Sequence, residues 1–246
     1  FNFEIKNTQR SVGARLAGDI AEKFGREGFP EKIILNFKGN AGQSFGCWNS
    51  KGVELKLNGL ANDYVGKGMN GGKIVITKNK YLNQERPVLV GNTCLFGATG
   101  GEFYVTGVAG ERFAVRNSGA RAIIEGTGDH CCEYMTGGEV IVLGPVGNNF
   151  GAGMTGGFAY VFDQDRSFVD KCNKDLVSFN RITSQEMEAH RSYLKDRISH
   201  FIKETNSKIG NEILEDFEKY QSLFWIVTPY AENLSRIIRK TREDAA

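Results

Sequence analysis

The sequence has no apolar stretch of the roughly 20 residues that are needed to cross a bilayer. Its first residues, FNFEIKNTQR, lack the charged-then-apolar layout of a signal peptide. There is also no basic block that could follow a phosphate backbone, because 31 Lys+Arg and 29 Asp+Glu leave a formal charge of only +2. These absences predict a cytoplasmic chain with no membrane or nucleic-acid partner.

Cysteine is present without the pattern of a disulfide framework or a metal site. The 5 cysteines are odd in number and irregularly spaced, which predicts reduced thiols. The stretch His130-Cys131-Cys132-Glu133 would alternate between the two faces of a strand, and no second cluster supplies further ligands, so we expect no metal there. Cys47 would need a neighbouring base to act as a nucleophile, and nothing in the sequence places His130, His190 or His200 beside it. We therefore expect Cys47 to be a small buried residue.

An initiator methionine is also missing, since the chain opens at Phe1. It is interpreted as a processed chain or as a piece of a longer one. The 246 residues are enough to bury a substantial core in one large domain or two smaller ones.

What the sequence does contain is an internal repeat. A glycine or glycine pair before an apolar run recurs in GMNGGKIVI, GATGGEFYV, YMTGGEVIV and GAGMTGGFAYVF. The repeat starts at Gly52, Gly71, Gly100, Gly119, Gly137 and Gly156, with spacings of 19, 29, 19, 18 and 19. The extra residues in one repeat lie after Ile76, where TKNKYLNQERP has the composition of a surface loop.

Two further columns keep the same phase as the glycines. Nine residues before the first glycine of the repeats from Gly71 onwards, the residues are Asn62, Gly91, Gly110, Gly128 and Gly147. Immediately before that glycine they are Asn70, Thr99, Ser118, Thr136 and Thr155. Glycine adopts positive φ without steric cost, and short polar side chains bond to nearby backbone, so both suit tight corners. The predicted coil corners are Gly52, Gly71, Gly72, Gly100, Gly101, Gly119, Gly137, Gly138, Gly156 and Gly157.

The apolar run after each corner predicts a strand. A turn of about 19 residues cannot bury its apolar face alone, whereas stacked turns form a continuous core with parallel strands. The sequence therefore predicts a mostly β protein built as a parallel β-helix of about six to seven coils. Corners recur at intervals of roughly nine and ten residues, and not every six, so a right-handed or irregular two-corner coil is preferred to a left-handed one.

The middle residue of each strand should point away from the interior, yet this column is apolar or aromatic. It comprises Val75, Tyr104, Ile123, Ile141 and Tyr160. An exposed ladder of this size would be unusual for a free monomer, so something should cover it. Either the C-terminal helices of the same chain pack there, or the ladder is a docking face for another domain or subunit.

The flanks of the repeat differ from it in pattern. Val12, Leu16, Ile20 and Phe24 recur every four residues and predict a helix from about Ser11 that stops at Gly25. Beyond Asp163 the pairs vanish, and TSQEMEAHRSYLKDRISHFIKETNS predicts helix with a capping box at Thr183 and Glu186. SLFWIVTP predicts a short buried strand or extended segment. We expect a β-helix domain over residues 1–165 and a helical extension over residues 166–246 packed on it.

One glycine column has two side-chain exceptions. Arg116 and Tyr134 stand where Gly68, Gly97 and Gly153 stand in other coils. An arginine that projects from a corner could anchor a neighbouring domain through forked hydrogen bonds. The candidate interface residues are therefore Arg116 and Tyr134, with Tyr104 and Tyr160 from the middle column.

The chain also resembles a known family. The runs NTQRSVGARLAGDIAEKFG, GQSFGCWNSKGVELKLNGLANDYVGKGMNGGKIVI and GDHCCEYMTGGEVIVLGPVGNNFGAGMTGGFAYVF resemble the C-terminal glycine-motif domain of the glutamate synthase large subunit. The resemblance covers about residues 1–165, and the tail is similar with weaker motifs. Family motif positions are matched at Arg15, Asn62, Tyr64, Gly66 and Gly68.

This resemblance implies a right-handed parallel β-helix that closes a multidomain enzyme. In that family an amidotransferase domain releases ammonia from glutamine, and a domain holding FMN and a 3Fe-4S cluster adds it to 2-oxoglutarate and reduces the product to glutamate. The β-helix would be a non-catalytic scaffold for both, with no catalytic, cofactor-binding or metal residue of its own. Two alternatives stay open: a similar subunit of formylmethanofuran dehydrogenase, and a stand-alone assembly scaffold. Stacking of repeats with an uncovered outer face could also allow the chain to self-associate. In a photosynthetic eukaryote the expected location is the plastid stroma in place of the cytoplasm.

Overall fold

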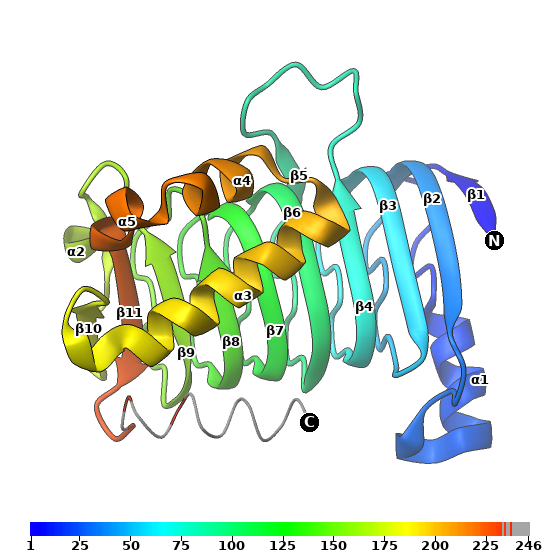
Figure 1. The fold of residues 1–246 in the computed structure, drawn as a ribbon. Helices are drawn as coiled ribbons and strands as arrows, with labels where there is room; N and C mark the ends of the chain where they lie inside the picture. The colour runs from blue at the N-terminus through cyan, green and yellow to red at the C-terminus, as the bar shows by residue number, and fades with distance from the viewer. Residues whose placement is uncertain (233, 235–236, 238–246) are drawn as a thin grey trace.

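A computed structural model describes residues 1–232, 234 and 237 of the chain. The repeat region is a parallel β-helix of about seven turns, as predicted (Figure 1). Its strands are β1 (Asn2–Ile5), β2 (Ile33–Ala41), β3 (Val53–Ala61), β4 (Asn70–Thr77), β5 (Val88–Val90), β6 (Gly100–Ala109), β7 (Ser118–Thr127), β8 (Thr136–Val142) and β9 (Gly156–Phe162). Neighbouring strands pair in parallel in the order β1-β2-β3-β4-β6-β7-β8-β9, so each coil adds one strand to the same wall.

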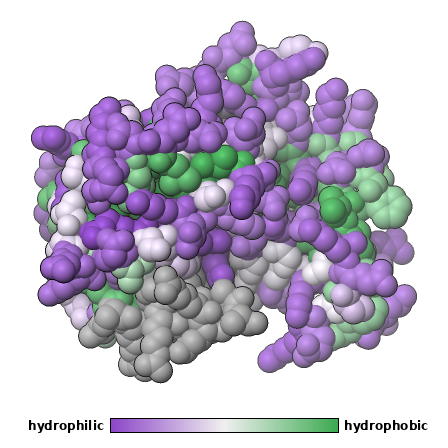
Figure 2. Space-filling view, viewed as in Figure 1, coloured by the Kyte–Doolittle hydropathy of each residue, from purple (hydrophilic) through white to green (hydrophobic). Residues whose placement is uncertain are grey.

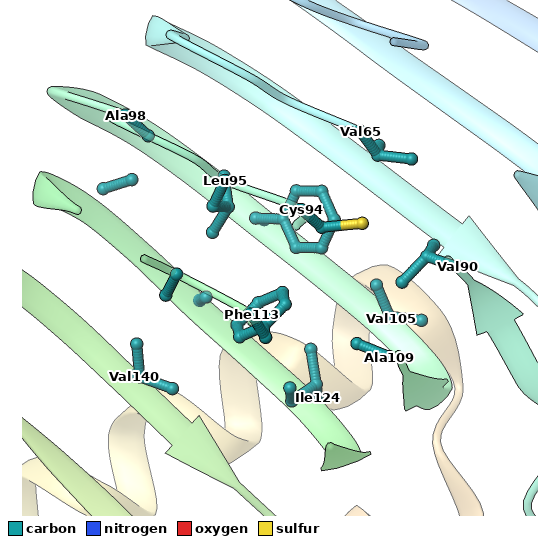
Figure 3. Close-up of a cluster of buried hydrophobic side chains, with 14 of the residues drawn as sticks. Val65, Val90, Cys94, Leu95, Ala98, Val105, Ala109, Phe113, Ile124 and Val140 are labelled. Carbon is teal, nitrogen blue, oxygen red and sulfur yellow. The ribbon is translucent and has the colours of Figure 1, made fainter. Parts of the chain in front are cut away.

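The interior of the coils is filled by alternate residues of each strand and by inward-pointing loop residues. Figure 3 shows Val105, Ile124 and Val140 from successive strands facing Cys94 and Phe113 from the opposite loops. Each of these side chains is at most 1% exposed. The stacked coils thus share one continuous core, which is the physical reason why a single coil of this length would not fold alone.

The segment before β2 contains the predicted N-terminal helix. Helix α1 (Ala14–Phe24) ends at Gly25, and Ala17 and Ile20 are its buried side chains. A short 3-10 turn, η1 (Gly25–Glu27), follows it. The long loop after β4 is also confirmed and protrudes from the solenoid before β5 (Figure 1).

The C-terminal region crosses the outer face of the wall and then joins it. Its elements are α2 (Phe168–Lys171), β10 (Val177–Arg181), η2 (Gln185–Met187), α3 (Glu188–Thr205), α4 (Lys208–Glu215), α5 (Phe217–Tyr220), η3 (Gln221–Leu223) and β11 (Phe224–Pro229). Strand β11, which lies within the predicted SLFWIVTP segment, pairs antiparallel with both β9 and β10. The last strands of the tail therefore extend the sheet of the solenoid.

The capping box predicted at Thr183 and Glu186 is wrong. The turn η2 starts after Ser184 without a side-chain cap, and helix α3 begins only at Glu188. Arg191 reaches back from the helix and donates hydrogen bonds to the carbonyl oxygens of Ile182 and Ser184, at 2.6 and 2.7 Å. Hydrogen bonds from Arg191, in place of a capping box, therefore fix the segment that leads into α3.

Helix α3 lies diagonally across the outer face of β4 to β9 (Figure 1). It covers the middle column of the strands, from Val75 to Tyr160, whose members are at most 2% exposed. The alternative in which the chain's own helices cover this ladder is confirmed. Tyr104 and Tyr160 were predicted as interface residues, and this prediction is wrong, because both are 0% exposed beneath the C-terminal region.

Most of the surface seen from this side is hydrophilic, and hydrophobic side chains show at the N-terminal end of the solenoid and in a band across the middle of the view, above α3 (Figure 2). Phe1, Phe3 and Ile34 are among the exposed large side chains at the N-terminal end, at 79%, 47% and 36%. Strand β1 is the edge strand at this end. Among the described residues, no helix has the length and apolar character that a membrane crossing requires.

Candidate functional site

The loops opposite the strands repeat an unusual backbone pattern. In each loop the first, third and fifth residues of a five-residue stretch have φ between about +50° and +75°, the left-handed region. The stretches are residues 44–48, 64–68, 93–97, 112–116, 130–134 and 149–153. Only some of these positions carry glycine. For any other residue the left-handed conformation raises the conformational energy by roughly 1–2 kcal/mol.

Hydrogen bonds between coils explain why the strained pattern persists. In the loop at residues 112–116, the amides of Arg112 and Arg116 donate to the next coil, at Asp129 and Glu133, with distances of 2.8 and 3.0 Å. The amide of Ala114, between them, donates to the previous coil at Cys94, at 2.9 Å. Alternate left-handed residues turn successive N–H groups in opposite directions along the solenoid axis, so one loop bonds to both neighbours.

The same alternation sorts the side chains of the loops. The middle left-handed residues are buried, as with Leu95, Ala114 and Cys132 at 0% exposed. The first and last project outward and form two parallel columns on one face of the solenoid. We call the exposed or half-exposed large side chains of these columns the loop face: Trp48, Tyr64, Arg112, Arg116, His130 and Tyr134.

The structure places Arg116 and Tyr134, the other two predicted interface residues, on the loop face. Tyr134 is 55% exposed, and its ring lies over Gly153 of the next coil, where an added Cβ would come within 2.5 Å of the ring. Trp48 is 56% exposed and lies over Gly68 in the same way, at 2.9 Å. Glycine in this column thus leaves room for the aromatic ring of the preceding coil.

The loop face carries free and paired charges. Arg112 pairs with Glu133 at 3.5 Å, and Lys67 lies 5.5 Å above the centre of the Tyr64 ring. Within the described part of the chain, Arg116 is exposed and makes no side-chain hydrogen bond or ion pair. Tryptophan, tyrosine and arginine are the residues that contribute most to binding energy at protein interfaces, so this face has the composition of a docking surface.

The predicted corner glycines lie where each loop enters its strand, and the two members of a pair serve different needs. The second members, Gly72, Gly101, Gly138 and Gly157, have positive φ between 67° and 96°. The first members from Gly71 onwards lie so close to the preceding coil that an added Cβ would stand 2.1 to 2.9 Å from its backbone. Gly52, at φ 88°, is likewise crowded by the carbonyl of Phe29 at 2.4 Å.

The cysteines and histidine singled out in the sequence form no reactive site in the described residues. Cys47 is buried as expected, at 1% exposed, and burial raises the pKa of its thiol. The stretch around Cys131 and Cys132 is a left-handed loop and not the expected strand, so both thiols turn inward, 3.7 Å apart. Among described residues no group of three or more His, Cys, Asp or Glu could hold a metal ion.

Sequence reasoning missed an alternating charge ladder on the outer face of the wall. The strand register places Glu54, Lys73, Glu102, Arg121 and Glu139 side by side across successive strands. Lys73 lies 3.4 Å from Glu102 and 4.0 Å from Glu54. The signal was present, since each residue lies two positions after the first glycine of its repeat, and their signs alternate.

Helix α3 binds to this ladder with complementary charges. The Arg197 guanidinium donates to Glu139 at 3.1 Å and to Glu102 at 3.3 Å, and Glu204 accepts from Lys73 at 2.7 Å and from Lys56 at 3.2 Å. Burial raises the pKa of Glu102, but Arg197, the Tyr104 hydroxyl and Lys73 outweigh that effect and leave it below its ordinary value. The ladder thus positions α3 over the middle column.

His190 and Tyr160 make a second buried contact between the tail and the wall. His190 Nε2 lies 3.0 Å from the carbonyl oxygen of Leu234, which can only accept, so Nε2 carries the proton. Burial lowers the pKa of His190, so the ring is neutral and Nδ1 accepts from the Tyr160 hydroxyl at 2.7 Å. This histidine is held in a structural contact away from Cys47.

Comparison with known proteins places the chain in a family. The GXGXG motif family matches residues 1–230. A ferredoxin-dependent glutamate synthase 2 of Synechocystis is 52% identical over 94% of this chain and 15% of its own length. The chloroplastic ferredoxin-dependent glutamate synthase 2 of Arabidopsis thaliana is 48% identical over 98% of this chain and 15% of its own length, and the ferredoxin-dependent glutamate synthase of Pyropia yezoensis is 50% identical over 94% and 15%.

Proposed function

Because the chain belongs to the GXGXG motif family and spans only about 15% of the glutamate synthases that it resembles, we propose that it is the scaffold domain of a glutamate synthase. The complete enzyme would convert glutamine and 2-oxoglutarate into two molecules of glutamate. The names of the relatives support ferredoxin as the electron donor of that enzyme, and the chloroplastic relative supports the plastid stroma as its location in a photosynthetic eukaryote. In other cells we propose the cytoplasm.

The scaffold role rests on the loop face. It presents Trp48, Arg116 and Tyr134 from three different coils of one rigid solenoid, which is the kind of element that positions a partner precisely. Trp48 and Tyr134 are four coils apart, a span of about 19 Å at roughly 4.8 Å per coil. We propose that the amidotransferase domain and the FMN-binding synthase domain dock on the solenoid, and that this chain supplies neither catalytic residue nor cofactor.

The cofactors proposed for the enzyme, FMN and a 3Fe-4S cluster, would be held by its other domains. The cysteines of this chain do not fit the cluster. Its cysteines are buried in the coil core, and burial raises the pKa of Cys94 to about 12 and of Cys172 to about 11, whereas cluster ligands are thiolates.

The decisive experiment mixes the purified chain with the rest of the glutamate synthase polypeptide, produced separately. We expect binding, and glutamine-dependent glutamate formation only in the mixture, with no flavin in the chain alone. Substituting Arg116→Ala together with Tyr134→Ala should weaken binding at least tenfold without changing the melting temperature. Flavin or activity in the isolated chain, or no binding, would contradict the scaffold role.

A further inference from the structure

A groove of about 320 Å³ lies between helix α1 and the Trp48 end of the loop face. On the helix side it is lined by Ala14, Ala17, Gly18 and Ala21. Their spacing of three, four and seven residues places them on one side of α1. Small side chains at such positions let a second helix approach the backbone closely.

The groove also contains a buried hydroxyl without a partner. Ser50 is 6% exposed, and its Oγ makes no hydrogen bond within the described part of the chain. Leaving a buried hydroxyl unpaired costs roughly 1–3 kcal/mol. Ser50 Oγ is itself closed to solvent, so a polar group in the groove would recover this cost after the Ser50 side chain rotates about χ1 toward it. This observation is independent of the small-residue lining and points to a polar ligand atom.

The charge of the lining is one-sided. Arg26 and Lys51 line the groove, and no aspartate or glutamate does. Trp48 forms a wall that is 56% exposed. A ligand that complements these surfaces carries a carboxylate beside small apolar side chains.

We infer that this groove docks an acidic amphipathic helix from the remainder of the glutamate synthase polypeptide. The helix packs its small side chains on Ala14, Ala17 and Gly18, and its carboxylate meets Arg26 or Lys51. The inference rests on the proposed function, since it takes the occupant from the longer polypeptide. The groove is continuous with the loop face, because Trp48 belongs to both.

Hydroxyl-radical footprinting of Trp48 tests the inference, with the isolated chain compared with the full-length glutamate synthase polypeptide. We expect Trp48 to be oxidised at least fivefold more slowly in the full-length polypeptide. Tyr81, which is 74% exposed at the protruding loop, serves as the reference.

A matched pair of variants then assigns the protection to the groove. Nothing lies within 4 Å of a Cβ added at Gly18, so a leucine side chain can enter the groove from this position, and leucine favours the helix more than glycine does. We expect Gly18→Leu to restore Trp48 oxidation in the full-length polypeptide, and Asp19→Leu, on the neighbouring exposed position, to leave the protection intact. Ser50→Ala and Arg26→Glu should each restore part of the Trp48 oxidation in the full-length polypeptide.

The outcomes separate the inference from the proposed function. Equal oxidation of Trp48 in the isolated chain and in the full-length polypeptide would overturn the inference that the groove is a docking site. If Tyr134 is protected in the same experiment, the proposed scaffold role stands. Protection of Trp48 that persists in the Gly18→Leu variant would also overturn the inference that a helix docks in the groove. If neither Trp48 nor Tyr134 is protected, both the inference and the docking of the loop face are wrong.

Discussion

At the scale of single residues, close approach between coils decides where side chains are allowed. A Cβ at Gly119 would stand 2.1 Å from the carbonyl oxygen of Thr99, and backbone atoms cannot move aside as a flexible side chain can. The requirement at this position is space, because its φ is not in the left-handed region. The glycines that turn the chain and the glycines that let coils touch are thus different residues of the same pair.

We predict that Gly119→Ala lowers the free energy of unfolding by about 3 kcal/mol or more, because the new Cβ forces the coils apart. Gly18→Ala is the matched control, since it lies in an open position of α1 and should raise stability by about 1 kcal/mol. Chemical denaturation measures both. Equal effects of the two substitutions would show that the contact with Thr99 is not the cause.

A second prediction concerns the left-handed residues that are not glycine. Thr93 has φ 59°, a conformation that is costly for a β-branched residue. We expect Thr93→Gly to raise the free energy of unfolding by about 0.5–1 kcal/mol, because the relieved strain exceeds the entropy that glycine adds to the unfolded chain.

Thr155→Gly is its control, because Thr155 is exposed and has no positive φ. That substitution should lower stability by about 0.5–1 kcal/mol. Thermal melting of the two variants gives the comparison, and a loss of stability in Thr93→Gly would mean that the threonine side chain makes a contact that outweighs its strain.

At the scale of elements, the tail is attached to the solenoid by ionisable groups whose pKa values move in opposite directions. Burial alone would raise the pKa of Glu204, but its hydrogen bond and charge interactions with Lys73, followed by those with Lys56, lower it overall. Burial raises the pKa of Glu125, and the hydrogen bond from Ser207 at 2.6 Å only partly offsets it. The first carboxylate therefore stabilises the docked tail when ionised, and the second destabilises it.

This difference predicts opposite effects of pH on two matched substitutions. Glu204 contributes stability above its unfolded pKa that is lost as pH falls through its lower folded pKa, so Glu204→Gln should lower the melting temperature at pH 7 and have little effect near pH 3. Glu125 lowers stability progressively as pH rises from its unfolded pKa through its raised folded pKa, so Glu125→Gln should raise the melting temperature at pH 8 and have little effect near pH 4. Melting curves across pH 3–8 check both, and a parallel pH dependence of the two variants would refute the assignment.

At the scale of the whole molecule, the solenoid and the tail share a hydrophobic layer. Helix α3 and strand β11 bury Tyr104, Ile123, Ile141 and Tyr160, and β11 continues the sheet beyond β9. A cut between the proposed domains at residue 165 would expose this layer and the edge of β9 to water. The two parts consequently bury this apolar layer only together.

We predict that residues 1–165 expressed alone are not a stable monomer, because the uncovered middle column is a large apolar patch. Binding of a hydrophobic dye and sedimentation should show exposed surface and aggregation, whereas the full chain should unfold in one cooperative transition. A monomeric fragment with the melting temperature of the full chain would establish residues 1–165 as an independent domain.

The sequence by itself determined the architecture of this protein. Its glycine repeat at 18 to 19 residues, with apolar triplets in phase, is enough to predict a parallel β-helix, because every coil repeats the same local geometry and only neighbouring coils touch. The helix ending at Gly25 and the segment containing β11 were predictable for the same reason, since each depends on a local pattern.

Only the tertiary structure decided which surfaces are covered and which are free. Tyr104 and Tyr134 are both aromatic residues of a β repeat, yet one is 0% and the other 55% exposed, because α3 crosses the strands and not the loops. The path of α3 depends on where Arg197 and Glu204 meet the charge ladder, which joins residues about 60 to 130 positions apart. Such long-range pairings leave no local period in the sequence, so the covered face and the loop face could be told apart only once the chain was folded.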